Sequence, residues 1–135
     1  MLKPALAVAG ILAAPTTLYV ALGGGESSTT NSGEAGFVIP DFSAQAYDGK
    51  EFFAAACGSC HGVYGEGTDT GPTLIHTLYG PLDFPDDLIV AAAKNGASAR
   101  NWPFGDMPPV DRLTPAQLEL AIGFLREVQA ANNID

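Results

Sequence analysis

The sequence predicts an all-α fold of three to five helices, and two stretches carry the main evidence. Residues 114–117, Thr-Pro-Ala-Gln, form a capping box with proline at the first helical position. Residues 85–95 begin with proline, continue with two aspartates and are followed by Gly96, as in a helix with favourable charge at its start and a glycine after its end. No stretch of residues 41–135 alternates apolar and polar residues with period two, so no sheet is expected.

The N-terminus predicts a membrane-directed segment. Lys3 precedes 22 uncharged residues, and the apolar run 5–22 is 18 residues long. A transmembrane helix needs ~17–25 such residues, whereas a signal-peptide core has ~7–15. We therefore expect an N-terminal hydrophobic helix, a signal anchor over residues 1–25, with its amino end in the cytoplasm. A cleaved signal peptide with a small-residue site at 21–23 is the alternative.

Residues 26–40 are rich in glycine, serine and threonine, which predicts a flexible linker. Residues 41–135 are then the folded domain. In it, residues 43–56 predict the first helix, and Gly49 lies on the same helical face as Phe53. Because glycine costs about 1 kcal/mol in a helix, its presence suggests the close approach of another helix. A helix that starts only at Asp48 or Gly49 is the alternative.

The remaining elements follow in order. Residues 62–74 predict a loop and residues 75–79 a short helical turn. The helix at 85–95 should have Pro85 at its first position, and a second loop covers residues 97–110. The last helix should fray near Asn132, and its apolar residues recur at helical spacing. These are Leu118, Ala121, Ile122, Leu125 and Val128.

The charge balance narrows the functional classes. The chain has 15 acidic and 6 basic residues and a net charge of −9, which argues against a nucleic-acid partner. All the acidic residues lie after residue 25. Such a domain favours a partner with a basic docking face, although solubility alone explains the charge equally well. No catalytic carboxylate pair, activated nucleophile or phosphate-binding loop stands out, so neither an enzyme nor a small-molecule substrate is expected.

Residues 57–61, Cys-Gly-Ser-Cys-His, have the spacing by which a haem c is attached. The thiols of Cys57 and Cys60 would form thioethers with the haem, and His61 would bind its iron as the proximal ligand. The window holds both cysteines and one of the two histidines of the chain. We therefore expect one covalent haem, which also adds apolar surface to a domain too small to bury a large core alone.

Three other interpretations of the two cysteines remain open. A thioredoxin-like pair expects a βαβ context, which is not visible here. Zinc takes about four ligands, and His76 is the one further nitrogen or sulfur donor of the usual kind. A disulfide across two intervening residues would be strained.

The sixth iron ligand is expected to be Met107, the one methionine besides Met1. It is followed by Pro108 and Pro109, which stiffen the loop and reduce the entropy lost when the thioether is held on iron. His76 is the alternative ligand, and otherwise a structural or surface residue.

With these residues the chain resembles the class I c-type cytochromes, specifically small mono-haem bacterial ones, over residues 42–131. The resemblance rests on residues 57–62, Gly65, Gly67, residues 71–72, Trp102, residues 105–109 and residues 113–115. It implies the class I cytochrome c fold, with helices wrapped around one covalently bound haem. It also implies that the first and last helices cross near Gly49, Phe53 and Phe124.

The resemblance implies further site residues. The carbonyl of Pro72 would accept a hydrogen bond from the second ring nitrogen of His61 and fix the ring. Arg100 and Trp102 would lie near the haem propionates, with simple packing and surface positions as the alternative. Residues 129–132 continue the resemblance, but no chemistry attaches to them.

The function implied is one-electron transfer between membrane respiratory or photosynthetic complexes on the periplasmic side of the bacterial membrane. A quinol:cytochrome c oxidoreductase and a terminal oxidase are the expected kinds of partner. One alternative is a haem subunit of a periplasmic dehydrogenase or oxidase. Another is an enzyme or gas sensor with an open sixth position on iron.

Overall fold

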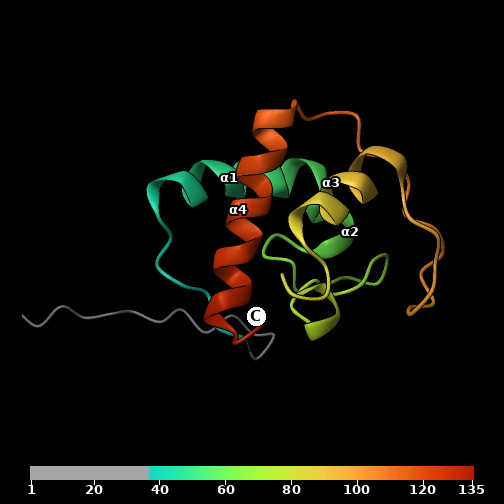
Figure 1. The fold of residues 1–135 in the computed structure, drawn as a ribbon, viewed down its shortest axis with the longest axis horizontal. Helices are drawn as coiled ribbons and strands as arrows, with labels where there is room; N and C mark the ends of the chain where they lie inside the picture. Colours follow the sequence, from blue (N-terminus) through green and yellow to red (C-terminus); the bar gives the residue numbers. More distant parts are fainter. Residues whose placement is uncertain (1–36) are drawn as a thin grey trace, which may run out of the picture.

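The computed structural model describes residues 37–135. They form the helices α1 (Ala44–Ala56), α2 (Gly58–His61), α3 (Asp86–Asn95) and α4 (Pro115–Ala131), with a 3-10 helix η1 (Thr77–Tyr79) (Figure 1). No strand forms within these residues, which confirms the all-α prediction for the domain.

The N-terminal helix expected at residues 1–25 lies outside the described residues, as does most of the expected linker. Across residues 37–135, no helix combines the length and the apolar character that crossing a bilayer requires. Directly before α1, the Val38 backbone exchanges two hydrogen bonds with the Asn132 side chain, at 2.7 and 2.8 Å. The segment that leads into α1 is thereby attached to the end of α4.

The first helix begins at Ala44, one residue after its predicted start, because Ser43 is its capping residue rather than its first helical residue. The hydroxyl of Ser43 accepts a hydrogen bond from the Ala46 N–H and donates one of 2.6 Å to the carboxylate of Glu127 on α4. This cap satisfies a free N–H group of the first turn and also joins the helix to its neighbour. The alternative start at Asp48 or Gly49 is therefore wrong.

The other two long helices follow their predicted signatures closely. In α4, Thr114 and Gln117 form the complete capping box with Pro115 at the first position. In α3, Pro85 is the capping residue rather than the first helical residue, because its ψ of 166° is extended. Its carbonyl still accepts the first hydrogen bonds of the helix, from Leu88 and Ile89. The predicted start was thus one residue early.

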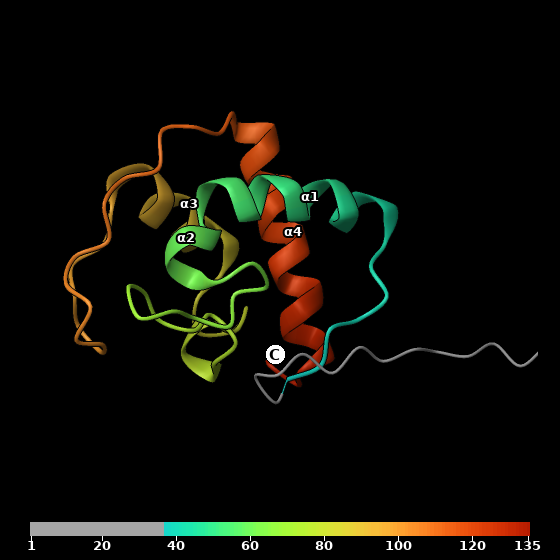
Figure 2. The same cartoon turned by 180° about the vertical axis from the view of Figure 1, so that it is seen from behind.

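The crossing of α1 over α4 is the main packing contact of the domain, and both views show it (Figures 1 and 2). Gly49 is buried there, and a Cβ on it would overlap the carbonyl oxygen of Leu120. The rings of Phe53 and Phe124 meet beside it, with centroids 5.4 Å apart, and Phe124 is fully buried. The expected close approach of the two helices is therefore confirmed.

The core continues along α4 in two directions. Toward α1 it contains a cluster of aromatic and aliphatic side chains. Toward α3 it contains Ala93, Leu118 and Ile122. Every apolar position predicted for the last helix is buried. α4 therefore supports both neighbouring helices and carries most of the core.

Replacement of Gly49 by alanine should lower the free energy of unfolding by about 1–3 kcal/mol, because the added Cβ meets backbone that cannot rotate away. The matched control is Gly123→Ala on α4, where a Cβ meets nothing within 4 Å. That change should stabilise the helix by up to about 1 kcal/mol. Chemical denaturation measures both changes, and equal effects would show that the two helices do not approach closely at Gly49.

Candidate functional site

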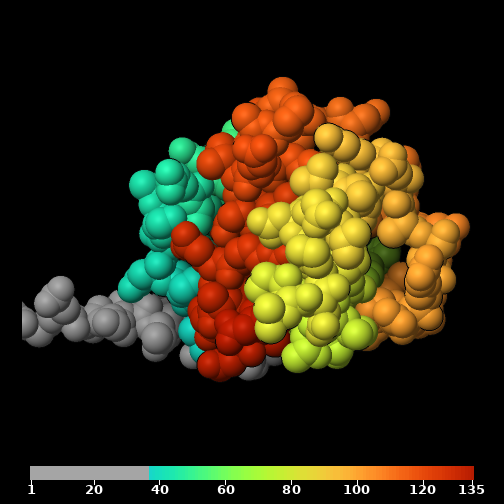
Figure 3. Space-filling model, in the orientation of Figure 1, coloured from blue at the N-terminus to red at the C-terminus, as the bar shows by residue number. Residues whose placement is uncertain are grey.

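A cavity of about 560 Å³ opens beside α4, within the ~300–1,000 Å³ usual for ligand pockets. Figure 3 shows the surface hollowed between α3 and the orange loop that follows it. Most of the lining is apolar. It includes Leu74, Tyr79, Phe84, Leu88, Ile89, Ala92, Ala93, Leu118, Ala121, Ile122 and Leu125.

The Cys-Gly-Ser-Cys-His motif lies at the end of α1. Cys57 donates its backbone N–H to Phe53 and accepts hydrogen bonds from the N–H groups of Cys60 and His61, so the chain bends there into the short helix α2. Cys57 and His61 line the cavity, whereas Cys60 is half-buried just outside it.

The His61 ring is oriented, and its protonation is shifted, in a way that favours binding of a metal ion. Its side chain is 8% exposed, and its Nδ1 lies 2.8 Å from the carbonyl oxygen of Pro72. The hydrogen bond expected between these two residues is therefore present. Burial lowers the pKa of His61 below its ordinary value, and the bond to Pro72 opposes this only in part. The neutral ring then donates Nδ1–H to Pro72, which leaves the lone pair of Nε2 free.

Pro72 is held in place by a loop wrapped closely around α2. The N–H of Gly67 bonds to the carbonyl of His61 at 2.6 Å, and the Thr68 hydroxyl donates to the carbonyl of Cys60 at 2.6 Å. Gly71 packs so tightly that a Cβ on it would lie 2.6 Å from the same carbonyl. These contacts explain why residue 71 is a glycine, and they hold Pro72 where its carbonyl fixes the orientation of the His61 ring.

The two thiols are not joined to each other. Burial, and then the neighbouring Cys60, raise the pKa of the Cys57 thiol to about 11, so the thiol is protonated at neutral pH. In the described part of the chain, no group of three or more His, Cys, Asp or Glu side chains is arranged to hold a metal ion.

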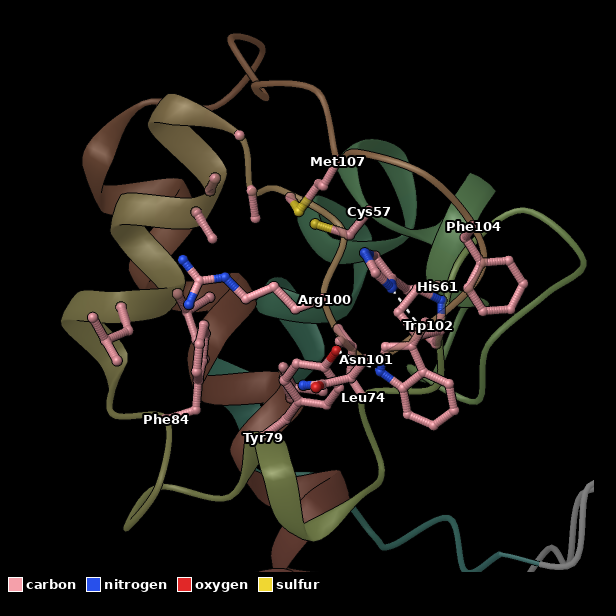
Figure 4. Close-up of a pocket in the computed structure, with 18 of the residues that line it drawn as sticks. Cys57, His61, Leu74, Tyr79, Phe84, Arg100, Asn101, Trp102, Phe104 and Met107 are labelled. Carbon is pink, nitrogen blue, oxygen red and sulfur yellow. Dashed lines mark hydrogen bonds between the residues drawn. The ribbon is translucent and has the colours of Figure 1, made fainter.

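Met107 lines the same cavity as His61 and Cys57 (Figure 4). Its backbone exchanges two hydrogen bonds with Ala97, at 3.0 and 2.8 Å. Gly96, which ends α3 with a φ of 75°, leaves no room for a Cβ against the Met107 carbonyl. The methionine is therefore tied to the end of α3. The sequence indicated only the stiffening by the two following prolines.

Arg100 and Trp102 also line the cavity. In Figure 4 the Arg100 side chain extends from its loop toward the α3 side. The indole N–H of Trp102 donates to the hydroxyl of Tyr79 at 2.8 Å, and its ring meets His76 edge-on. His76 itself is not part of the lining. Its Nδ1 accepts a hydrogen bond from the Leu78 N–H and caps η1.

The sequence interpretation assigned no role to two polar residues of α4, Arg126 and Gln129. Gln129 is fully buried and donates to the carbonyls of Leu74 and Tyr79, and Arg126 donates to the carbonyls of Tyr79 and Phe84. The available indication was that Gln129 follows Leu125 by four residues, so a polar side chain occupies the apolar face of the helix.

The site fits a haem. The cavity is largely apolar, a neutral imidazole offers a free nitrogen, a thioether lies in the same lining, and two cysteines precede the histidine within four residues. These are the donors by which c-type haem is held.

The comparison with family models agrees with this geometry. The model described as Cytochrome c matches residues 46–129, which is more than half of the chain. The chain therefore belongs to the cytochrome c family, as a class I c-type cytochrome. Proteins of this family carry electrons on haem, and their partners are redox proteins. No curated protein and no solved structure gave a match.

The close contact between Gly96 and the Met107 carbonyl predicts that a larger residue at position 96 displaces Met107. Gly96 and Gly105 both have positive φ, 75° and 82°, but only a Cβ on Gly96 would meet the Met107 carbonyl, at 2.5 Å. Alanine costs about 1–2 kcal/mol at either position for the backbone conformation, and about 1–3 kcal/mol more at Gly96 for the contact.

Chemical denaturation and the visible spectrum of the oxidised, haem-loaded protein test this expectation. Gly96→Ala should change the spectrum because it displaces Met107, whereas Gly105→Ala should leave it unchanged. Identical spectra for the two variants would show that the contact does not position the methionine.

Proposed function

We propose that this protein is a one-electron carrier with a single haem c, joined to Cys57 and Cys60 and ligated by His61 and Met107. The observation that carries the proposal is the cavity that His61 and Met107 both line, next to the attachment motif. When bound, the haem supplies the exchange of one electron between ferrous and ferric iron.

The residues of the chain would set how easily that electron is lost. Pro72 orients His61 and raises its basicity through the hydrogen bond at Nδ1. The soft thioether of Met107 favours ferrous iron, and the apolar lining disfavours the additional charge of ferric iron. We therefore expect a relatively high reduction potential. With both axial ligands present, no position on iron remains for a substrate.

The proposed setting is the periplasmic side of the bacterial membrane. The uncharged residues 4–25 support an anchor. The chain has 15 acidic and 6 basic residues, and this negative net charge supports docking to basic partner surfaces. Suitable partners are a quinol:cytochrome c oxidoreductase and a terminal oxidase, or their photosynthetic counterparts. Contacts with them would be small and short-lived. A tether would raise the effective concentration of the carrier at both.

Replacement of Met107 by alanine tests the sixth ligand. The reduction potential should fall by on the order of 0.1 V, since the choice of axial ligands spans about 0.8 V across haem proteins. The reduced variant should also bind carbon monoxide, because a position on iron becomes free. Potentiometric titration and visible spectroscopy measure these changes.

His76→Ala is the control, because His76 lies outside the cavity lining; it should leave the potential and the spectrum unchanged. An unchanged potential in Met107→Ala would refute the assignment. Carbon monoxide binding by the wild-type reduced protein at neutral pH would instead favour a gas sensor or an enzyme with an open site.

The N-terminal anchor is tested by the mass of the protein recovered from the membrane fraction. We expect one intact chain plus one haem, because the apolar run is long enough to span. A chain that begins near residue 24 and appears in the soluble periplasmic fraction would show cleavage. Stoichiometric co-purification with an enzyme would indicate a fixed haem subunit of a dehydrogenase or oxidase rather than a mobile carrier.

A further inference from the structure

One wall of the cavity is formed by a segment with little regular structure, and hydrogen bonds from polar side chains of α4 hold this segment in place. Leu74, Tyr79 and Phe84 direct their side chains into the lining. Their carbonyl groups face the other way and accept hydrogen bonds from Arg126 and Gln129. The segment between Leu74 and Phe84 contains only the 3-10 turn η1 as regular structure. It is attached to α4 by this network and by the packing of Leu74 and Ile75 against the apolar core of α4.

Arg126 is the centre of the network. Its guanidinium donates to the carbonyls of Tyr79 at 2.8 Å and Phe84 at 2.6 Å, to Oε1 of Gln129 at 2.6 Å and to the carboxylate of Asp86 at 2.8 Å. A planar, five-donor group suits several acceptors in fixed directions, which a lysine cannot match. No buried side-chain polar atom of the described residues lacks a partner, so the network is complete.

The network also places a charge behind the cavity wall. The guanidinium is always protonated, and the Arg126 side chain is only 16% exposed. Its acidic partner Asp86 is 65% exposed, so water screens the carboxylate more strongly than the guanidinium. This ion pair therefore contributes a net positive potential on the side of the cavity formed by Tyr79 and Phe84.

We propose that Arg126 is a positioning residue that holds the wall formed by Leu74, Tyr79 and Phe84, and that its charge raises the reduction potential of the protein. The proposal rests on the proposed function, because it requires a one-electron centre in the cavity. Oxidation adds one positive charge to that centre, which a nearby fixed cation disfavours. Arg126 thus makes the protein a weaker electron donor and fixes the shape of the pocket with the same side chain.

The test uses redox titration of the full-length, haem-loaded protein and hydrogen exchange of residues 74–86. Arg126→Met should lower the equilibrium constant for reduction on the order of threefold to tenfold, where tenfold equals about 59 mV for one electron. It should also accelerate exchange in the segment. Arg126→Lys should accelerate exchange as well, yet keep most of the potential because the charge remains. Asp86→Asn should shift the potential upward.

Arg112→Met is the matched control, since Arg112 is exposed and makes one weak contact of 3.5 Å, to the carbonyl of Ala55. It removes the same charge and should change the potential less than Arg126→Met does. The charge role is overturned if the two methionine variants shift the potential equally, or if Arg126→Lys shifts it as much as Arg126→Met. The positioning role is overturned if hydrogen exchange in residues 74–86 is unchanged in both Arg126 variants.

If Arg126→Met does not mature, the pair Arg126→Lys and Asp86→Asn decides the matter. The charge role is then supported by an upward shift in Asp86→Asn beside a nearly constant potential in Arg126→Lys, and any other result overturns it. The wild-type titration separates the two proposals. A wild type without a one-electron transition fails the proposed function, whereas a normal wild type with unshifted variants fails only the charge role of Arg126.

Discussion

The close contact of α1 with α4 at Gly49 is the constraint on which the rest of the structure depends. α1 ends at Ala56, directly before Cys57, so the place where it crosses α4 determines where the attachment motif lies relative to the cavity. A side chain at Gly49 would push α1 away from the Leu120 carbonyl and shift His61 with it. Gly49 thus positions the attachment motif that follows α1, including His61 at the end of α2.

α4 also connects the other parts of the site. Its apolar face meets α1 and α3 and contributes Leu118 and Leu125 to the cavity. Its polar residues Arg126 and Gln129 attach the wall segment, which has little regular structure of its own. A loop-rich domain can therefore hold a defined pocket, because one well-capped helix supplies both the apolar contacts and the hydrogen bonds.

Much of this arrangement was predictable because its causes are local. The capping box of Thr114 and Gln117 consists of short-range hydrogen bonds, and α4 begins where this box predicts. α1 begins one residue after its predicted start because Ser43 caps the helix instead of belonging to it. The attachment motif is five consecutive residues. The start of α3 was predicted one residue early because proline suits both the capping and the first helical position, and only the ψ of Pro85 distinguishes them.

The sequence by itself determined the three long helices, the attachment motif and the small set of possible axial ligands, because spacing and residue chemistry are readable along the chain. Only the tertiary structure decided which of Met107 and His76 lines the cavity, and that Arg126 and Gln129 hold its wall. The hydrogen bonds of these two α4 residues to the wall join positions 42 to 55 residues apart. Such pairings depend on how α4 packs against the loops, and helical spacing alone does not predict them.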